Sequence, residues 1–467
     1  MTRIVIMGGG PAGYESALVA APHGAEVTVV ESDGAGGACV LYDCVPSKTF
    51  IASAGARSAF RDADELGIRT NNAEAAVELP VVHGRVKGLA LAQSADVRAR
   101  LQREGVRIIS GKARFCDDKP GLAQHRVAVQ LNDGSTEVLD ADVVLIATGA
   151  TPRVVPGAEP DGERILTWRQ IYDLPELPSH LAVIGSGVTG AEFASAYTEM
   201  GVKVTVASSR DRVLPHEDAD AAAVLEDVLA ERGTEVVKQA RAEKVERTAD
   251  GVIVHLADGR TIEASHALMT VGSVPNTGDI GLDRIGIEPG RGGFIPVDRV
   301  SRTTVSGVYA AGDCTGVLML ASVAAMQGRI AMWHALGEAV NPIRLKTVAS
   351  NVFTNPEIAN VGISQHAIDS GEVPARTIMM PLATNARAKM EGVRRGFVKL
   401  FCRPATGVVI GGVVVAPNAS ELILPIALAV QNQLTVEHLA HTFSVYPSLS
   451  GSITEAGRQL IRHDDLD

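Results

Sequence analysis

Short apolar runs and glycine-rich turns alternate near the N-terminus. Residues 3–7 (RIVIM) form an apolar run, residues 8–13 (GGGPAG) form a glycine-rich turn, and a helical pattern continues to Ala21. A second apolar run, residues 26–31 (EVTVVE), ends in an acidic side chain. Short apolar runs bounded by glycine are typical of buried strands. The pattern therefore predicts a strand, a turn, a helix and a second strand.

The same order of elements returns in the middle of the chain. Residues 181–184 predict a strand, residues 185–190 (GSGVTG) a turn, residues 191–200 a helix and residues 202–207 a strand. The two turns begin 185 − 8 = 177 residues apart. One GxGxxG is a weak signal, but two copies in this setting indicate two dinucleotide-binding units. In each, glycine lets the backbone approach a pyrophosphate at a helix N-terminus.

Two further segments have the same strand-and-turn character. Residues 142–149 (DVVLIATG) and 308–313 (VYAAGD) each predict a buried strand that ends in a tight turn. The proline-rich residues 152–178 indicate a connector. In the last quarter of the chain the pattern changes to strands, at residues 396–402 and 407–415, followed by helices. This change predicts a third domain of α+β type.

Composition and charge exclude several classes of function. The formal net charge of −11 argues against nonspecific binding of nucleic acid or of anionic membranes. The N-terminus starts directly with a strand pattern and lacks the features of a signal peptide. The longest apolar run, residues 408–417, is far shorter than the roughly 18 residues of a membrane span. We therefore expect a cytoplasmic protein without a membrane span.

The cysteine usage favours catalysis over a structural role. The five cysteines are Cys39, Cys44, Cys116, Cys314 and Cys402. This odd, scattered set does not look like the disulfide framework of a secreted protein. In a reducing compartment a close pair such as Cys39 and Cys44 is more often catalytic or metal-binding than structural. No second cluster of Cys and His stands at zinc-site spacing, so we predict no metal.

A series of motifs appears in one order along the chain: GGGPAG, GGAC…CVPSK, ATG, GSGVTGAE, VGSVPN, AAGD and VFTNPEIANVG. Together they resemble the FAD-dependent pyridine nucleotide–disulfide oxidoreductases, the family of lipoamide dehydrogenase, glutathione reductase and mercuric reductase. The resemblance covers essentially the whole chain. It implies an α/β fold with two Rossmann-like domains and a C-terminal α+β dimerisation domain. The FAD domain would comprise residues 1–150 and 271–345, the NAD(P)H domain residues 151–270, and the dimerisation domain residues 346–467.

The resemblance also assigns cofactor-binding residues. For FAD they are Gly8, Gly10, Gly13, Glu31, Gly37, Lys48, Ala113, Thr148 and Asp313. For NAD(P)H they are Gly185, Gly187, Gly190, Glu192, Ser208, Arg210 and Gly272. Glu31 would accept hydrogen bonds from the adenosine ribose, and Asp313 would bind near the ribityl chain. Lys48 would lie beside the flavin N5, pair with Glu192 and stabilise the anionic reduced flavin.

The second unit indicates NADPH. Units that prefer NAD usually end the second strand with an acid that binds the ribose 2′-hydroxyl. Here Ser208 stands at that position, followed by Ser209 and Arg210. A carboxylate would repel a 2′-phosphate, whereas two hydroxyls and a guanidinium can bind one. We expect NADPH to be accepted and preferred, with NADH as a second donor; the alternative is that Arg210 is a solvated loop residue.

The cysteine pair has the spacing of a redox-active disulfide. In the resembling family the two cysteines start a helix over the flavin, so Cys44 would be the flavin-proximal thiol and Cys39 the one that attacks substrate. Leu41 and Asp43 depart from the Asn and Gly that are common in the family. Asp43 places a negative charge beside Cys44, which should raise its thiol pKa. The alternative is a pair of reduced packing cysteines.

The base that this chemistry needs is missing. In the family a His-Pro near the C-terminus of the partner subunit supplies it, oriented by a Glu five residues later. The matching segment here is SVYPSLSG, with Tyr446 at the His position and Gly451 at the Glu position. Neither His441 nor Glu455 is in register. A histidine is a competent base at pH 7, whereas a tyrosine is only about 0.1% deprotonated there. Losing a positioned base typically costs about 10²–10⁴-fold in rate.

The double replacement favours a quinone reductase. Transfer of electrons from NADPH through FAD to a quinone needs neither the cysteines nor the base, and the departure resembles the lipoamide-dehydrogenase-like NAD(P)H:quinone reductases. The candidate catalytic residues are Cys39, Cys44, Lys48, Glu192 and Tyr446. One alternative is an NAD(P)H-dependent disulfide reductase, for lipoamide, with an unrecognised base. Another is a non-enzymatic flavin redox sensor. Mercuric reductase is disfavoured, because the chain has no N-terminal metal-binding domain and no C-terminal cysteine pair.

The C-terminal loop predicts a shared site. The resemblance implies a homodimer in which Tyr446 of one subunit lies near the flavin of the other. An aromatic side chain there would offer a flat apolar wall to a quinone.

Overall fold

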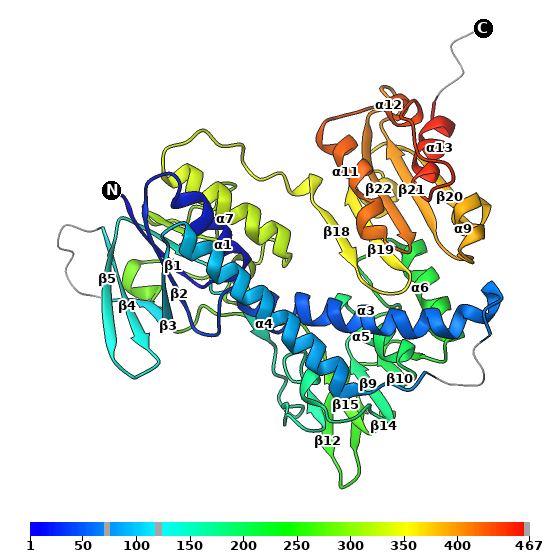
Figure 1. Ribbon diagram of the computed structural model, residues 1–467, viewed down its shortest axis with the longest axis horizontal. Coiled ribbons are helices and arrows are strands. Elements are labelled where there is room, and N and C mark those ends of the chain that lie inside the picture. The colour runs from blue at the N-terminus through cyan, green and yellow to red at the C-terminus, as the bar shows by residue number, and fades with distance from the viewer. Residues whose placement is uncertain (70–74, 117–123, 462–467) are drawn as a thin grey trace. The chain divides into compact units, whose positions relative to one another are not determined.

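The computed structural model describes residues 1–69, 75–116 and 124–461 (Figure 1). The chain divides into two compact units. Unit 1 comprises residues 1–49, 83–153 and 272–343, and unit 2 comprises residues 50–82, 154–271 and 344–467. Two long helices, α3 (Cys44–Arg61) and α4 (Leu79–Arg103), each contain a boundary between the units. The three-domain division drawn from the sequence stays a prediction.

Unit 1 is built around a seven-stranded sheet. In spatial order its strands are β17 (Val308–Ala310), β6 (Val143–Ile146), β1 (Arg3–Met7), β2 (Glu26–Glu31), β3 (Arg107–Phe115), β4 (His125–Leu131) and β5 (Thr136–Ala141). The strands from β17 to β3 are parallel, and β3, β4 and β5 form an antiparallel meander. A two-stranded ladder of β7 (Ala150–Pro152) and β16 (Ser273–Pro275) completes the strands described in this unit.

Two helices of unit 1 cross at close range. Helices α1 (Pro11–Ala20) and α7 (Ala321–Ala335) lie side by side (Figure 1). Gly328 permits the contact, because a Cβ there would lie 2.3 Å from the carbonyl oxygen of Ala12. The close approach fixes α1, whose N-terminus follows the first glycine turn.

The central strand β1 is buried on both faces. Ile4 and Ile6 pack in the cluster that contains Ala17 of α1, whereas Val5 and Met7 pack in a second cluster on the opposite face. Alternate side chains of a strand point to opposite faces, and a parallel strand covered on both sides reads as a continuous apolar run. The strand predicted for residues 3–7 is confirmed.

Unit 2 contains a second parallel sheet. In spatial order its strands are β11 (Glu235–Val237), β10 (Lys203–Ala207), β9 (His180–Ile184), β15 (His266–Met269) and β8 (Ile165–Leu166). Helices α5 (Val188–Glu199) and α6 (Ala219–Glu231) alternate with these strands along the chain. An antiparallel sheet of β12 (Ala242–Arg247), β13 (Val252–Leu256) and β14 (Thr261–Ala264) is inserted before β15. The predicted strand, turn, helix and strand of residues 181–207 are confirmed.

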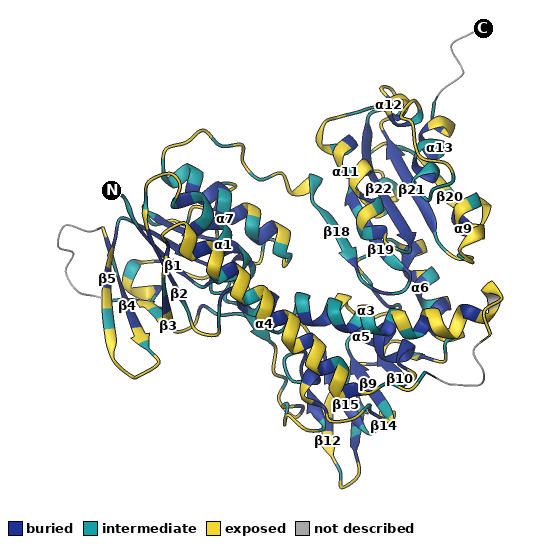
Figure 2. Ribbon diagram, in the orientation of Figure 1, coloured by how far each residue is buried: buried dark blue, intermediate teal, exposed yellow. Residues whose placement is uncertain are grey.

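The C-terminal part of unit 2 is an antiparallel sheet with helices. Its strands, in spatial order, are β18 (Ala349–Val352), β19 (Glu357–Gly362), β22 (Val409–Ala416), β21 (Phe397–Cys402) and β20 (Arg376–Pro381). Strands β21 and β22 are buried along their whole length (Figure 2). The helices are α8 (Gln365–Asp369), α9 (Ala386–Met390), α10 (Ala419–Leu422), α11 (Leu424–Gln431), α12 (Val436–Ala440) and α13 (Gly451–Gln459). This arrangement is the predicted α+β domain.

The predicted connector contributes a strand. Residues 152–178 contain β8, and its residues Ile165 and Leu166 are buried and pair with Ala267 and Leu268 at the edge of the unit 2 sheet. The surrounding prolines are typical of a loop, so the sequence pattern did not predict a strand at these two apolar residues. The edge position explains its short length, because only one neighbour holds it.

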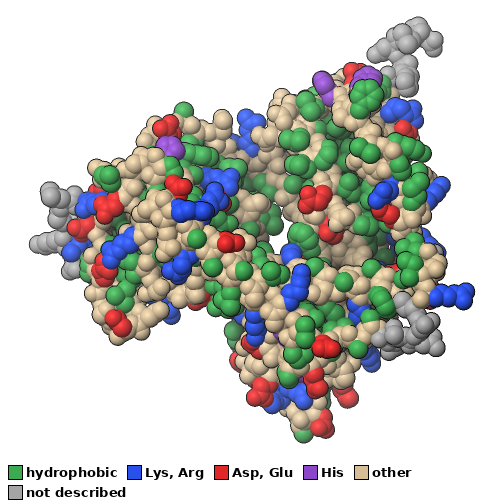
Figure 3. Space-filling view, in the orientation of Figure 1, with side chains coloured by type: hydrophobic (Ala, Val, Ile, Leu, Met, Phe, Trp, Pro, Cys, Tyr) green, Lys and Arg blue, Asp and Glu red, His purple; other side chains and the backbone are tan. Residues whose placement is uncertain are grey.

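The surface is charged and mixed in sign. Lys, Arg, Asp and Glu side chains are interspersed over the face shown in Figure 3. In the described part of the chain, no helix combines the length and the apolar character needed to span a bilayer.

Candidate active site

The first glycine turn, between β1 and α1, can only be built from glycine at its two ends. Gly8 has φ +111°, and a Cβ there would lie 2.2 Å from the Ala147 carbonyl oxygen. A Cβ on Gly13 would lie 1.9 Å from the carbonyl oxygen of Gly8. Gly10 differs, because its Cβ would meet nothing closer than the Gly36 oxygen at 3.9 Å. The turn therefore leaves open space at the N-terminus of α1, where a pyrophosphate would bind.

Glu31 lies against this turn. Its carboxylate accepts hydrogen bonds from the backbone N–H of Gly9 at 2.6 Å and of Asp33 at 2.7 Å. Gly37, with φ +57°, packs so closely that a Cβ would lie 2.9 Å from Gly10 Cα. Glu31 and Gly37 thus border the open space at Gly10, as the predicted FAD site requires.

The other predicted FAD residues also lie in unit 1. The side chain of Thr148 interacts with the buried Cys314 thiol and lowers its pKa, although burial raises that pKa more strongly. Asp313 begins a 3₁₀ turn, and burial together with the nearby Asp43 raises the pKa of its carboxyl to about 6. Ala113 pairs with Val129 between β3 and β4. The open position at Gly10 and the helix N-terminus together fit a dinucleotide such as FAD.

The two cysteines lie in separate helices. Cys39 lies in the short helix α2 (Gly37–Leu41), and Cys44 is the first residue of α3. Both are free thiols in this structure. A hydrogen bond with Cys39, burial and the charge of Asp43 raise the pKa of the Cys44 thiol, while the charge of Lys48 opposes them. The site therefore favours the protonated thiol at Cys44 over the reactive thiolate.

The second glycine turn, between β9 and α5, repeats the geometry of the first. Gly185 has φ +113°, and a Cβ there would lie 2.4 Å from the Thr270 carbonyl oxygen. A Cβ on Gly190 would lie 2.1 Å from the oxygen of Gly185, whereas a Cβ on Gly187 would meet nothing within 4 Å. The turn has the same open position at the start of its helix.

The residue at the end of β10 turns inward. Ser208 is fully buried, and its hydroxyl lies 2.7 Å from the Ser186 hydroxyl. The Ser208 oxygen also accepts a hydrogen bond from the backbone N–H of Arg210 at 3.2 Å. Ser209 and Arg210 are exposed. Ser208 therefore shapes the loop, and the two residues after it face solvent.

Glu192 and Gly272 are the other two residues predicted to bind NAD(P)H. Glu192 lies on α5 with 4% of its surface exposed, and its Oε1 accepts a hydrogen bond from the backbone N–H of Phe353 at 2.9 Å. Gly272, in unit 1, has φ +91° and accepts a hydrogen bond from the Arg153 N–H at 2.9 Å.

The C-terminal loop presents apolar side chains to solvent. Tyr446, between α12 and α13, is 85% exposed, and Phe443 is fully exposed. Gly451 is the first residue of α13, and a Cβ there would approach only the Ser448 hydroxyl at 3.7 Å and the Ser444 hydroxyl at 3.9 Å. A larger side chain therefore fits at position 451, so packing does not explain the absence of a glutamate.

Comparison with known proteins identifies the family. Residues 2–328 match the family described as pyridine nucleotide-disulphide oxidoreductase, and residues 348–457 match its dimerisation domain. The chain belongs to the pyridine nucleotide-disulphide oxidoreductases. It is therefore an oxidoreductase, and membership implies FAD and a nicotinamide nucleotide as cofactors. The predicted fold class, two Rossmann-like domains and a dimerisation domain, is confirmed.

Several relatives of this oxidoreductase align along nearly their whole length. A Mycobacterium tuberculosis protein named NAD(P)H dehydrogenase (quinone) is 66% identical, over 100% of this chain and 95% of the relative. A dihydrolipoyl dehydrogenase of Chlorobaculum parvum is 34% identical, over 97% and 96%. The crystal structure of LpdA from M. tuberculosis superposes with a TM-score of 0.95 at 65% identity, covering 99% of this chain and 100% of that one. The flavoprotein disulfide reductase RclA of Escherichia coli, at 24% identity and a TM-score of 0.86, shares the fold.

Some functional contacts of this oxidoreductase were missed in the sequence. The hydrogen bond between the Ser186 and Ser208 hydroxyls joins the turn to the end of the next strand, and the charge of Asp43 helps to raise the pKa of Asp313 in a distant motif. One signal for the first was present: the interval from Gly8 to Glu31 (31 − 8 = 23) equals that from Gly185 to Ser208 (208 − 185 = 23). Because the spacing and the order of elements are the same, Glu31 and Ser208 occupy equivalent positions at the ends of their strands.

Proposed function

We propose that this oxidoreductase passes electrons from NADPH through FAD to quinones or similar small acceptors. The observation that carries the proposal is the pair of replacements at the dyad positions, Tyr446 and Gly451, which leaves the cysteine pair without its base. The raised pKa of the Cys44 thiol supports the same conclusion, because it disfavours the thiolate that this flavin-proximal cysteine would use in a disulfide reaction. The name of the 66% identical relative agrees with a quinone acceptor.

The roles of the residues follow from their positions. Bound FAD would take two electrons and a proton from NADPH and deliver them to the acceptor. The open space at Gly10 would hold the pyrophosphate of FAD, with Glu31 on its ribose. Lys48 would place a positive charge near the flavin, and Glu192 would bind the nicotinamide end of NADPH. None of these roles uses Cys39.

NADPH is the proposed donor. The exposed Arg210 would bind the 2′-phosphate, and the exposed Ser209 would add a hydroxyl. Ser208 would act indirectly, because its buried hydroxyl holds the backbone N–H of Arg210. NADH would bind without the phosphate contact and therefore more weakly.

We further propose that the enzyme is a homodimer with a shared acceptor site. The match of residues 348–457 to the dimerisation domain supports this assembly. The exposed Phe443 and Tyr446 would then form an apolar wall beside the flavin of the partner subunit.

Turnover with two acceptors tests the proposal. NADPH oxidation by the purified flavoprotein should be fast with menadione and near background with lipoamide. The double variant Tyr446→His, Gly451→Glu should raise lipoamide reduction by about 10²-fold or more, because it restores a positioned base. Fast lipoamide turnover by the unaltered enzyme would contradict the proposal.

The contact of Cys39 with Cys44 keeps disulfide reduction as a second candidate. It predicts that Cys44→Ser abolishes turnover with every acceptor. The quinone proposal predicts that most menadione turnover survives this substitution.

A further inference from the structure

A short segment of unit 2 lies along one face of α5. Three side chains of α5, Glu192, Ser195 and Glu199, stand at positions i, i+3 and i+7, so they share a face of the helix. Each of them accepts a hydrogen bond from residues 353–355, which connect β18 to β19. We call residues 353–356 the strap. The strap and α5 both belong to unit 2.

Asn355 is the main anchor of the strap. Its backbone N–H donates to the Ser195 hydroxyl at 3.1 Å, and its side-chain amide donates to Glu199 Oε1. Its carbonyl oxygen accepts a hydrogen bond from Arg232 Nη1 at 3.1 Å. The backbone N–H, the carbonyl oxygen and the side-chain nitrogen of Asn355 are therefore all held. Thr354 adds an internal bond, from its buried hydroxyl to the Pro356 carbonyl oxygen at 2.7 Å.

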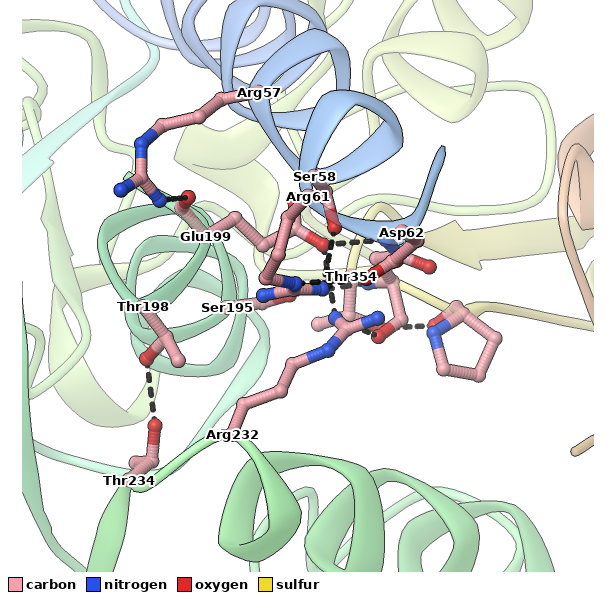
Figure 4. A network of polar contacts seen from close by, with 12 residues as sticks. Arg57, Ser58, Arg61, Asp62, Ser195, Thr198, Glu199, Arg232, Thr234 and Thr354 are labelled. Atoms are coloured by element: carbon pink, nitrogen blue, oxygen red, sulfur yellow. Dashed lines mark hydrogen bonds and ion pairs between the residues drawn. The ribbon is translucent and has the colours of Figure 1, made fainter. Parts of the chain in front are cut away.

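The acceptor of the Asn355 side chain is itself fixed by an ion pair. Glu199 is 1% exposed and lies 2.9 Å from Arg232 Nη1, which comes from the residue after α6 (Figure 4). Burial raises the pKa of the Glu199 carboxyl, and the charge of Arg232 opposes this shift. A buried carboxylate with these partners cannot turn toward solvent without breaking its ion pair with Arg232. The anchor is therefore rigid.

The other end of the strap reaches the candidate active site. The backbone N–H of Phe353 donates to Glu192 Oε1 at 2.9 Å. A carboxylate oxygen held by a fixed N–H sets the rotamer of the side chain, and the second oxygen is then aimed in one direction. Glu192 is the residue whose carboxylate is proposed to bind the nicotinamide end of NADPH.

We infer that the strap is a positioning device for Glu192, with Ser195 and Asn355 as positioning residues that fix where Phe353 presents its N–H. The inference rests on the proposed role of Glu192. It assigns a function to Ser195 and Asn355 that neither has through contact with a cofactor. Loss of the Ser195 hydroxyl would let the strap shift, and Glu192 would lose its orientation without any change in its own chemistry.

The test is a double-mutant cycle on the FAD-loaded enzyme. Ser195→Ala, Glu192→Gln and the double variant are compared by calorimetric titration with NADP⁺ and by the rate at which NADPH reduces the flavin. Ser195→Ala should weaken NADP⁺ binding and slow flavin reduction by about 2- to 10-fold, the usual effect of one hydrogen bond. In the Glu192→Gln background the same substitution should change neither quantity, because the residue acts through Glu192.

The matched control is Thr198→Val on the same helix. The buried Thr198 hydroxyl bonds to the Thr234 hydroxyl at 2.6 Å and not to the strap (Figure 4). Its loss should cost similar stability in urea unfolding yet leave NADP⁺ binding and flavin reduction unchanged. If Ser195→Ala does not yield a folded flavoprotein, Asn355→Ala serves in the same cycle.

Four outcomes would overturn the inference. They are no effect of Ser195→Ala, an equal effect in both backgrounds, an equal effect of Thr198→Val, and no effect of Glu192→Gln. Only the absence of an effect of Glu192→Gln also contradicts the proposed role of Glu192. Neither NADP⁺ binding nor flavin reduction involves the electron acceptor, so these results do not depend on the outcome of the menadione test.

Discussion

The two glycine turns have nearly the same backbone and different chemistry around it. Gly8 and Gly185 have φ values of +111° and +113°. Gly10 and Gly187 have φ and ψ of −68°, −173° and −73°, −172°. In both turns the outer glycines are required by close backbone contacts, and the middle one faces open space. The glycines therefore set the shape that admits a dinucleotide, and they do not decide which one.

The difference lies in the residue at the end of the second strand. In the first unit, the Glu31 carboxylate accepts from the N–H of Gly9 and stays at the rim of the turn. In the second unit, the Ser208 hydroxyl pairs with the Ser186 hydroxyl and is buried, and the exposed Arg210 follows. One turn thus presents a negative charge and the other a positive charge. We propose that this exchange of charge selects between the nucleotides.

The largest expected effect comes from the glycines that the two turns share. Gly13→Ala and Gly190→Ala each place a Cβ about 2 Å from a backbone oxygen. Each should lower the free energy of unfolding by about 3 kcal/mol or more, because backbone must move. Gly13→Ala should also release FAD, whereas Gly190→Ala should retain it. Urea unfolding and the flavin content of the purified protein measure both effects.

Helical glycines without such contacts provide the control. Gly55 in α3 has no atom within 4 Å of its ideal Cβ, so Gly55→Ala should be neutral or stabilising by up to about 1 kcal/mol. Gly10→Ala and Gly187→Ala should keep near-normal stability but weaken binding of FAD and NADPH, respectively. Equal free energies of unfolding for Gly13→Ala and Gly55→Ala would contradict the predicted clash of the Cβ at position 13 with the Gly8 carbonyl oxygen.

The next effect exchanges the charge at the strand end. Ser208→Glu should turn the second unit into a copy of the first and shift the kcat/KM ratio of NADPH to NADH by about 10²-fold toward NADH. A carboxylate would accept from the ribose hydroxyls and repel the 2′-phosphate. Steady-state kinetics with both donors measure the ratio. Ser208→Ala is the control, because it removes the hydroxyl without adding a charge. An unchanged ratio in Ser208→Glu would show that the charge at this position does not select between NADPH and NADH.

A smaller effect is expected from the exposed cation. Arg210→Ala should raise the KM for NADPH by about 10-fold and leave that for NADH unchanged, because only NADPH carries the phosphate. The control is Arg241→Ala, which removes an exposed cation of the same unit, just before β12. It should leave the KM for both donors unchanged. A parallel loss with both donors would mean that Arg210 supports the loop and does not bind the phosphate.

The smallest effect concerns Asp43, the negative charge beside Cys44. Asp43→Asn should lower the pKa of the Cys44 thiol and raise its alkylation rate by iodoacetamide about 2- to 5-fold near neutral pH. The sign follows because a neighbouring carboxylate disfavours the thiolate. Mass spectrometry of the reduced protein measures the rate. Asp133→Asn, in an exposed turn of the same unit, should leave the rate unchanged.

Much of the fold could be predicted because it is encoded over short distances. Strand β1 and both turns follow from apolar runs and glycine spacing within ten to fifteen residues. The inward orientation of Ser208 could not be predicted, because it depends on a hydroxyl at residue 186. The hydrogen bond between Glu192 and Phe353 spans 161 residues, so only the folded chain brings it together. Strand β8 was hidden because two residues carry too little pattern to stand out among prolines.

The open position at Gly451 has a consequence for how such an enzyme changes its chemistry over generations. Neither Gly451 nor the solvent-facing Tyr446 supports the core, so substitutions there leave foldability untouched. If the proposed role of this loop in choosing the acceptor holds, a lineage can change acceptor here without passing through unstable intermediates. The reaction would then be more evolvable than the scaffold that performs it.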